Sequence, residues 1–240
     1  MAILVKTFGM APGDRFDLHS HDDHQLAWAA AGVLMANAEA GTWVLPPTRA
    51  LWIPAHVPHE VLASGRAKMR ALYIRPTRCP IRWRQPQPVA ATRLLAELID
   101  HLAGPELNPA RRARAEAVLI DLLKPVAIAT IDAPLPVDGP ARDVADALFA
   151  NPADPRTLDQ WGHEVGASGR TLARAFRDDT GLPFGRWRTT ARLQAALPHL
   201  AAGEPVTTVA RHVGYQTPSA FVAAFHRETG LTPGSYFRRE

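Results

Sequence analysis

The sequence predicts an α+β protein of two domains, with a β-rich amino-terminal half followed by helices and an all-helical carboxy-terminal half. Three observations support this fold class. Short apolar runs between turn residues fill residues 1–83. The apolar period then changes to that of helices in residues 84–132. Residues 141–240 contain one helix–turn–helix pattern twice.

The composition of the 240-residue chain limits its chemistry. A single cysteine, Cys79, excludes an intrachain disulfide framework and a cysteine-based zinc finger. No apolar run reaches the ~18 residues of a membrane span, and the first residues lack the body of a signal peptide. We therefore expect a cytoplasmic protein with no membrane partner.

Residues 1–83 are expected to form strands. The runs TWVLP, ALWIP and MRALYIRP combine β-branched and aromatic residues with flanking turn signals. We expect Trp28, Trp43 and Trp52 to lie in the core of this domain rather than to form a platform for a ligand.

Residues 84–132 are expected to be helical. VAATRLLAELIDHLA places leucines and an isoleucine on one helical stripe, and Asn108 and Pro109 begin a second helix that stops before Pro125. The stripe is either a dimer seam or a cover for the open side of the β-domain. Residues 133–140, APLPVDGP, are expected to form a stiff linker between the domains.

The carboxy-terminal domain, residues 141–240, repeats one structural unit. When this segment is aligned with itself, the residues of the second helix match their counterparts at one constant offset. Upstream of the turn, the offset between matching residues is one residue shorter. The matched pairs are Leu172/Phe221, Phe176/Phe225, Thr180/Thr229, Gly181/Gly230, Leu158/Val206, Trp161/Val209, Gly162/Ala210 and Val165/Val213. The pattern predicts two copies of a helix, a tight turn and a second helix.

The residue types suit this motif. Gly162 and Ala210 are small where two helices cross closely, and Ser168 or Thr217 caps the second helix. Glycines open the turn and follow the second helix. The alternative is a plain helical bundle with a duplicated hairpin.

One face of each second helix is left free. A DNA major groove admits such a helix, whose amino-terminal half reaches the base edges. The residues expected on this face are Ser168, Arg170, Thr171, Arg174 and Arg177 in the first unit and Gln216, Thr217, Ser219, Ala220, Ala223, His226 and Arg227 in the second.

The segment between the two units, PFGRWRTTARLQAALPHLAAG, is predicted to be one connecting helix. A helix of about 20 residues is ~30 Å long, close to the ~34 Å of one DNA turn. Pro198 lies inside it and costs ~3 kcal/mol or more, so we expect a kink or a break.

The distribution of charge favours double-stranded DNA as a partner. The net charge is +4, yet the stretch from Ser168 to the end holds ten arginines, no lysine and five acidic residues. The planar guanidinium group suits phosphates and guanine edges. The alternative reading is the arginine bias of a GC-rich genome.

GYQTPSAF and FHRETGLTPGSYF resemble the second half of the AraC/XylS-type transcription-regulator domain, and TLDQWGHEVGASGRTLARAFRDDTGLPFGRWR its first half. The resemblance covers residues 141–239. It implies binding of promoter DNA, with bases read by Arg170 and Arg174 in the first unit and by Gln216, Thr217 and Ser219 in the second. A homodimer that matches paired half-sites, and a contact with RNA polymerase, are further expectations.

GDRFDLHSHDDHQLAWAAAG is similar to the first cupin motif, with Gln25 where a glutamate is usual. TRALWIPAHVPHEVLA resembles the second motif at Pro54 and His59 but departs from it at Thr48, His56 and Ala63. The resemblance implies a cupin-like β-barrel, which is the usual sensing half of AraC-type regulators.

The histidines of these motifs are candidate ligands. On a strand, His19 and His21 would point the same way. A closed barrel would bring them to His59, with Gln25 as a fourth partner. Neutral imidazoles suit zinc, nickel, copper or ferrous iron, and the alternative occupant is a small organic effector. The remaining histidines are expected on the surface, in loops or without partners: His24, His56, His101, His163 and His199.

Two functions remain in competition. The first is a transcription regulator whose barrel senses a small molecule or a metal and thereby changes its affinity for promoter DNA. The second is a metal-dependent cupin enzyme, of the dioxygenase or isomerase type, with a helical appendage. The missing carboxylate at Gln25 and the duplicated carboxy-terminal unit favour the regulator, so we expect no catalytic residues.

Overall fold

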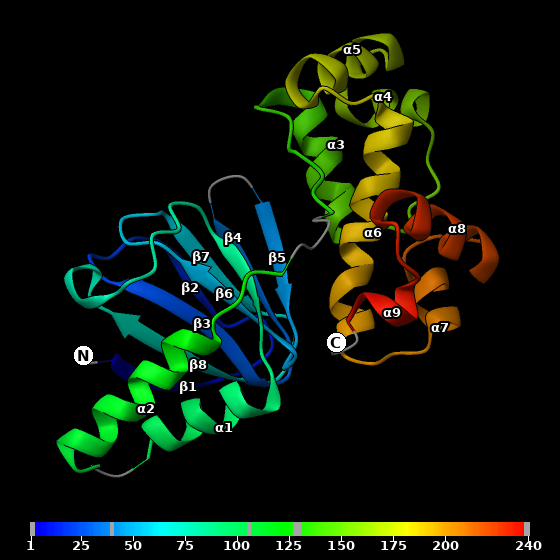
Figure 1. Ribbon diagram of the computed structural model, residues 1–240. Coiled ribbons are helices and arrows are strands. Elements are labelled where there is room, and N and C mark those ends of the chain that lie inside the picture. The colour runs from blue at the N-terminus through cyan, green and yellow to red at the C-terminus, as the bar shows by residue number, and fades with distance from the viewer. Residues whose placement is uncertain (1–2, 39–40, 105–106, 127–130, 238–240) are drawn as a thin grey trace. The chain divides into compact units, whose positions relative to one another are not determined.

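The computed structural model describes residues 3–38, 41–104, 107–126 and 131–237, in two compact units. The amino-terminal unit extends to residue 128, and the carboxy-terminal unit spans residues 129–236. The predicted division into a β-rich domain and a helical domain is confirmed (Figure 1).

The amino-terminal unit contains two antiparallel sheets. One has the strand order β1-β8-β3-β6-β9 and the other β2-β7-β4-β5. The strands are β1 (Ile3–Met10), β2 (Arg15–His19), β3 (His24–Ala31), β4 (Leu34–Ala38), β5 (Gly41–Leu45), β6 (Arg49–Ile53), β7 (His59–Ala63), β8 (Ala67–Ile74) and β9 (Gln87–Ala90), with a 3₁₀ turn at Pro76–Arg78.

The central strands of the five-stranded sheet are buried on both faces. Along β3, Leu26 and Trp28 belong to one apolar core and Ala27 and Ala29 to another. Successive side chains of a strand point to opposite faces. The second core lies between the two sheets, and the first is completed by helices. Both faces are covered, which explains why these strands read as continuous apolar runs.

Helices α1 (Arg93–Leu102) and α2 (Pro109–Leu122) cover the outer face of the five-stranded sheet (Figure 1). Leu95, Ile99 and Leu102 of α1 are buried in the same core as Trp28 and Trp52. The leucine stripe therefore closes the β-domain. The buried members of the stripe are not available for a dimer seam, because the sheet already covers them.

Residues 84–90 differ from the prediction. They were expected to be helical, but Gln87–Ala90 forms strand β9 and pairs with β6 from Arg49↔Ala90 to Trp52↔Gln87. The helical period begins only at Arg93, after the Thr92 cap. A four-residue strand is too short to show its period in the sequence.

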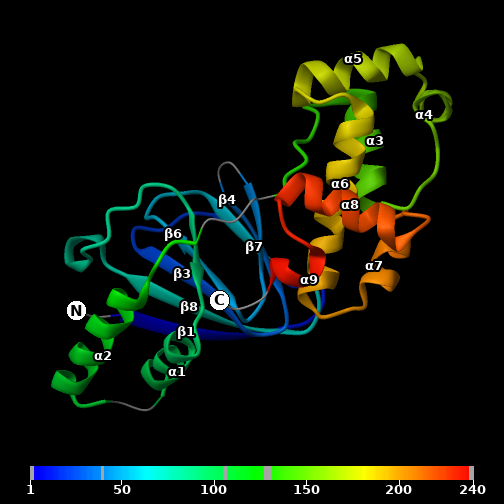
Figure 2. The same cartoon turned by 45° about the vertical axis from the view of Figure 1, so that its right-hand side comes forward.

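The carboxy-terminal unit is helical throughout its regular structure. Its helices are α3 (Gly139–Ala150), α4 (Leu158–Val165), α5 (Gly169–Thr180), α6 (Phe184–Ala201), α7 (Val206–His212), α8 (Pro218–Thr229) and α9 (Pro233–Tyr236). Both views show α5 near one end of α6 and α8 farther along it (Figures 1 and 2).

Residues 133–140, expected to be an interdomain linker, belong to this unit. The Ala133 N–H donates a hydrogen bond to Oε1 of Gln194 (2.9 Å), and the Trp187 indole N–H donates to the carbonyl of Pro134 (2.6 Å). The proline-rich segment packs on α6 because two α6 side chains satisfy its backbone groups.

The connecting helix is continuous. We expected a kink or a break at Pro198; helix α6 runs from Phe184 to Ala201 with Pro198 inside it, so there is no break. Pro198 lies in the last turn, where it removes only one backbone hydrogen bond. At 1.5 Å per residue the helix is ~27 Å long, somewhat shorter than the expected ~30 Å.

Candidate DNA-binding surface and histidine cluster

The first helix–turn–helix unit is formed by α4 and α5. Gly162 lies so close to the turn that a Cβ on it would meet the Ala167 carbonyl oxygen at 2.4 Å. Gly166 ends α4 with a φ of 67°, a conformation that favours glycine. Ser168 then caps α5 by accepting a hydrogen bond from the Thr171 N–H (3.0 Å).

The second unit, α7 and α8, repeats this turn. The Ala167 N–H donates to the carbonyl of Gly162 (2.9 Å), and the Tyr215 N–H donates to the carbonyl of Ala210 (2.8 Å) at the aligned position. Thr217 caps α8 by accepting from the Ala220 N–H (3.2 Å). The internal repeat of the sequence is therefore a repeat of hydrogen-bonded geometry.

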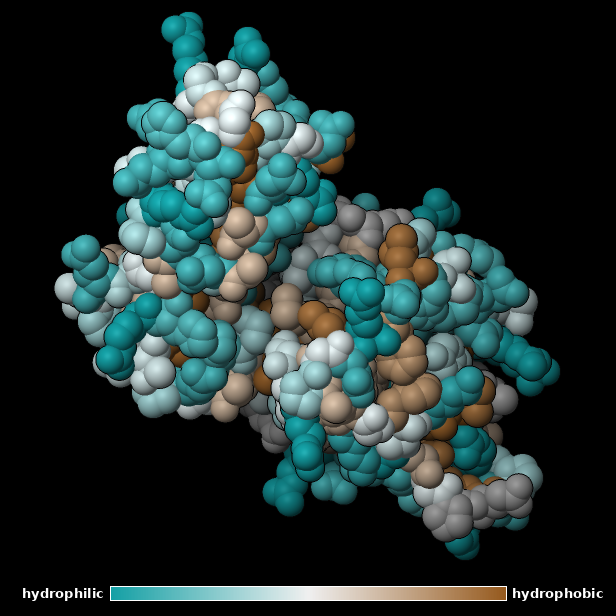
Figure 3. Space-filling model, turned by 180° about the vertical axis from the view of Figure 1, so that it is seen from behind, coloured by the Kyte–Doolittle hydropathy of each residue, from teal (hydrophilic) through white to brown (hydrophobic). Residues whose placement is uncertain are grey.

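All twelve residues predicted to face DNA are exposed in the structure, as the burial pattern of α5 and α8 shows. The opposite faces carry Leu172 and Phe176 in α5 and Phe221 and Phe225 in α8, each at most 1% exposed. Hydrophilic residues cover much of the helical unit in the space-filling view (Figure 3). The structure thus leaves both candidate reading surfaces accessible.

Arginines of this unit differ in their surroundings. The guanidinium groups of Arg188 and Arg192 are turned inward and donate to carbonyl oxygens of residues 152–156. Those of Arg170, Arg174 and Arg177 on α5 form no ion pair with any residue that the structure describes. The charges of these three α5 side chains are therefore available to a phosphate or a base.

Sequence reasoning missed a basic cavity beside the second unit. It has a volume of about 590 Å³ and includes Arg188, Arg192, Arg211, Thr189 and Gln216 in its lining. Arg211 lies on α7 and is exposed. The residues come from α6, α7 and the turn before α8, so no single sequence motif contains them.

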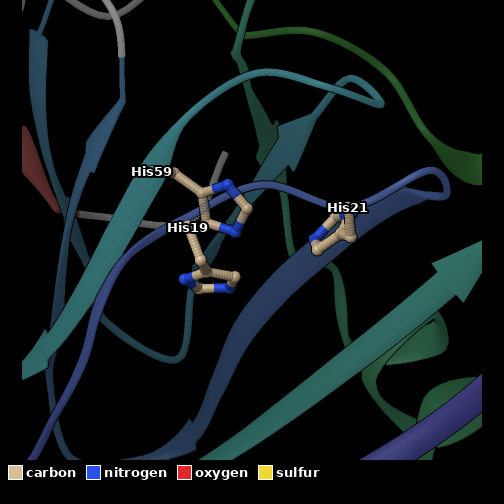
Figure 4. Close-up of side chains that lie close together, drawn as sticks. All are labelled: His19, His21 and His59. Atoms are coloured by element: carbon tan, nitrogen blue, oxygen red, sulfur yellow. The ribbon is translucent and has the colours of Figure 1, made fainter.

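In the amino-terminal unit, the predicted convergence of histidines occurs. His19 ends β2 and pairs in register with His59, the first residue of β7. Ring centroids of His19 and His59 are 4.4 Å apart, and those of His21 and His59 5.0 Å (Figure 4). One nitrogen from each of the three rings lies within 4.8 Å of the others.

His21 reaches this cluster from outside the strand. It lies in the connection after β2, not on the same strand face as His19 as predicted. Its Nδ1 lies 2.6 Å from the carbonyl oxygen of Asp23. The connection between β2 and β3 therefore orients the ring, where the sequence suggested strand alternation.

The three imidazoles share one pattern of hydrogen bonds. Nδ1 of His19, His21 and His59 lies 2.7, 2.6 and 2.9 Å from a backbone carbonyl oxygen, respectively. A carbonyl only accepts, so Nδ1 carries the hydrogen in each neutral ring. Nε2 is then an acceptor in all three. In metal sites, a hydrogen bond at the other ring nitrogen fixes the tautomer of a ligating histidine in the same way.

Gln25 completes the cluster. Its side chain is 2% exposed, and its Oε1 lies 2.7 Å from Nε2 of His21 and 3.1 Å from Nε2 of His59. Two arrangements satisfy these acceptors. Either the amide turns so that its NH₂ group donates to both rings, or a cation lies among the lone pairs.

Burial lowers the pKa of His59 from its ordinary 6.5 to about 4, assisted by the nearby His19 and His21 rings. The ring is 0% exposed. His59 is therefore neutral at physiological pH and has an unprotonated nitrogen available for a metal ion.

The space next to the cluster is small. A cavity of about 20 Å³ lies between the sheets and is lined by His19, Gln25, Phe8, Phe16, Val61, Met69 and Tyr73. This is the volume of about one water-sized probe. A single ion fits beside the histidines, whereas an organic effector requires rearrangement of the aromatic lining.

The metal-free protein is expected to lose stability in weak acid because of His59. Since its pKa is about 4 when folded and 6.5 ordinarily, the unfolded chain binds more protons between these values. Above pH 6.5, the neutral His59 ring therefore contributes roughly 3 kcal/mol to the unfolding free energy. This contribution is lost as the pH falls to 4. Urea unfolding at several pH values in a chelator measures this loss. His59→Gln should reduce the pH dependence of the unfolding free energy, whereas His163→Gln, a control at an exposed site, should leave it unchanged. Equal pH dependence in the unchanged protein and both variants would contradict the assignment to His59.

Two of the other histidines differ from their predicted settings. His24 begins β3, its Nδ1 accepts from the Ala55 N–H (3.0 Å), and its ring packs at 4.9 Å from that of Trp52. His199, expected to have no partner, lies beside Glu204 and His212. Trp28 and Trp52 are buried as predicted, and Trp43 packs partly buried against the core between the sheets.

Comparison with known proteins identifies both units. Residues 4–123 match the family model of the AraC-like ligand binding domain, and residues 161–239 match a helix-turn-helix domain. The chain is 30% identical over 229 residues to the HTH-type transcriptional regulator NimR of Escherichia coli (strain K12), covering 92% of this chain and 82% of NimR. It is 40% identical over 103 residues to the regulator RipA of Corynebacterium glutamicum, covering 43% of this chain and 31% of RipA. A structure of ToxT from Vibrio cholerae aligns over 99% of this chain and 98% of its own, with a TM-score of 0.39 and 9% identity.

A tandem helix–turn–helix unit behind an antiparallel ligand-binding domain defines a class of DNA-binding transcription regulators that respond to an effector. The chain belongs to the AraC family of this class. Both relatives are named as transcription regulators, which favours the regulator over the cupin-enzyme alternative. Within the described residues, no helix is both long enough and apolar enough to cross a membrane.

Proposed function

We propose that this regulator reads promoter DNA with both α5 and α8 and that a divalent transition metal ion, held by His19, His21 and His59, is its effector. The observation that supports the reading helices is the repeated turn geometry, with every predicted contact residue exposed on one face of its helix. Arg170, Arg174 and Arg177 contact bases and phosphates in the first unit. In the second unit, the DNA contacts start at Gln216, Thr217 and Ser219. The expected contact surface continues along α8 to Ala220, Ala223, His226 and Arg227.

Selection of binding sites from random duplexes by the full-length protein tests this function. We expect a preferred sequence with two short recognised segments about one DNA turn apart, since two reading helices enter successive major grooves. Affinity should fall steeply with salt. A single recognised segment would leave only one unit in contact with DNA and would contradict the proposal.

Arg211 is expected to contact the DNA backbone. It lies on α7, the first helix of its unit, and such a helix crosses the phosphates. Arg211→Ala should weaken binding to all sequences alike and reduce the slope of log K against log salt by about 1. The measurement is a salt titration of affinity, with Arg66→Ala in the amino-terminal unit as the charge-matched control. An unchanged slope, or a change in sequence preference, would exclude this role.

The choice of a metal ion over an organic effector rests on the donor set and on the space. Nε2 of His21 and Nε2 of His59 both lie within hydrogen-bond distance of the Gln25 side-chain amide, and one ring nitrogen of His19 lies within 4.8 Å of the other two imidazoles. Imidazole suits zinc, nickel, copper and ferrous iron. The adjoining cavity admits little more than one small ligand.

Metal analysis of the purified chain tests this proposal. His21→Ala is expected to remove one bound ion per chain or to lower its affinity at least ~100-fold, because His21 offers one of the three imidazoles. The control is His163→Gln. The change in DNA affinity on addition of metal should be larger in the control than in His21→Ala. If a metal-free organic molecule copurifies at this site instead, the effector is organic.

We further propose that the protein acts as a homodimer in the cytoplasm and contacts RNA polymerase at the promoters it binds. Leu94 of α1 and Val118 of α2 are 55% and 46% exposed, respectively, on the helices that cover the β-domain. They leave apolar surface for a second copy, and the two-fold symmetry of a dimer suits paired half-sites. Analytical ultracentrifugation with and without metal measures the oligomeric state.

A further inference from the structure

A second group of side chains with metal-binding chemistry lies in the carboxy-terminal unit. His199 is in the last turn of α6, Glu204 is in the turn that follows, and His212 is the last residue of α7. One ligand atom from each of the three lies within 4.8 Å of the others. Nδ1 of His199 is 2.7 Å from Oε1 of Glu204, and the ring centroids of His199 and His212 are 4.4 Å apart.

The turn between α6 and α7 brings these residues together. Gly203 has a φ of 82°, which allows the chain to reverse direction after α6. The Glu204 N–H then donates to the carbonyl of His199 (3.1 Å), so Glu204 folds back over the end of the helix. Helix α7 starts at Val206 and packs on α6, which returns His212 to the side of His199.

The chemistry of the group suits a transition metal ion. Two imidazoles and one carboxylate are a common donor set for zinc. In a tetrahedral site with bonds of ~2.0–2.2 Å, the ligand atoms lie about 3.3 Å apart, so the three residues need only small side-chain rotations. The side chains of His199 and Glu204 are 31% and 38% exposed, which leaves room for such rotations and for a water ligand.

The electrostatic setting also favours a cation. Helices α6 and α7 both end at this group, and the carboxyl end of a helix carries a partial negative charge from its free carbonyl groups. The carboxylate of Glu204 adds a further negative charge at the same place. A helix-capping hydrogen bond from His199 to Glu204 would account for these two residues alone. It gives no role to His212, which reaches the group from another helix.

We propose that His199, Glu204 and His212 bind a divalent transition metal ion of the zinc type. Such an ion ties the end of α6 to α7. Because α7 packs on α8, the ion holds the second helix–turn–helix unit in one orientation on the connecting helix. The metal site does not depend on the proposed function, whereas any effect of the ion on DNA affinity does.

The test uses the full-length, metal-stripped protein with His19→Ala and His21→Ala, which remove two imidazoles of the amino-terminal cluster. Co²⁺ is added while its visible absorption is recorded, and Zn²⁺ is then used to displace it. We expect one Co²⁺ per chain. His212→Gln in this background should lower the affinity at least ~100-fold, and His163→Gln, an exposed histidine of the same unit, should leave it unchanged.

A background protein that binds no Co²⁺, or a His212→Gln variant that binds it as tightly as His163→Gln, would overturn the site. The chain with an intact amino-terminal cluster gives a second measurement. There His212→Gln should reduce the number of bound ions by one, from two to one if both sites exist and from one to none if the amino-terminal site fails. Amide exchange of residues 199–212 should slow on Zn²⁺ addition in His163→Gln and not in His212→Gln.

Discussion

Replacement of Arg174 by alanine is expected to weaken binding of the preferred DNA sequence by about 5- to 150-fold, which corresponds to ~1–3 kcal/mol. Arg174 is exposed on α5 and lies one turn after Arg170, on the face opposite Leu172 and Phe176. A base contact by a forked guanidinium group is directional, so its loss also relaxes the preference at one position. Affinity measurements on the selected sequence and on its single-base variants test both effects.

Arg142→Ala is the matched control for this experiment. Arg142 belongs to the same unit, but its guanidinium group is paired with Asp146 on α3 (3.0 Å). Its removal changes the charge by the same amount and should reduce affinity only slightly. If Arg174→Ala binds all sequences as Arg142→Ala does, Arg174 does not read a base. If both variants bind as the unchanged protein does, α5 does not enter the groove.

Replacement of Glu116 by alanine is expected to destabilise the amino-terminal unit by about 3 kcal/mol. Glu116 is 0% exposed on α2. Its Oε1 accepts from the Ile3 N–H of β1 (2.9 Å) and from Nε of Arg112 (3.1 Å), and Arg112 in turn donates to the Ile3 carbonyl (2.7 Å). Loss of the carboxylate leaves a buried N–H and a partly buried guanidinium group without their partner.

Chemical denaturation of the full-length protein, followed by the tryptophans of the amino-terminal core, measures this loss. Glu116→Gln should cost less than Glu116→Ala, because the amide oxygen still accepts from Ile3. Glu97→Ala, at an exposed position of α1, should change the unfolding free energy by less than ~0.5 kcal/mol. Equal stability of Glu116→Ala and Glu97→Ala would show that the bond between α2 and β1 contributes nothing.

The exposed faces of α5 and α8 were predictable because their determinants are local. Gly162, Gly166 and Ser168 each specify one step of a tight turn, and the aligned residues of the second copy specify the same step. The apolar positions of α5 and α8 recur at helical spacing, so the exposed face followed from the buried one. The structure confirms the caps and the buried positions of both helices.

Contacts between distant segments were not predictable in this way. Strand β9 pairs with β6 through backbone groups that leave no side-chain signature. The segment at 133–140 reads as a linker because the side chains that hold it, Trp187 and Gln194, lie more than fifty residues away. Glu116 lies four residues after Arg112 on α2, and its burial depends on β1, whose Ile3 N–H donates to it.

The sequence by itself determined the two-domain α+β class, the duplicated helix–turn–helix unit and the residues that this unit exposes, because spacing and turn chemistry act over a few positions. Only the tertiary structure decided which arginines remain free, that the leucine stripe covers a sheet, and that His199 meets His212. Those outcomes depend on which element packs against which, and packing is settled by burial and hydrogen bonding between segments that are far apart along the chain.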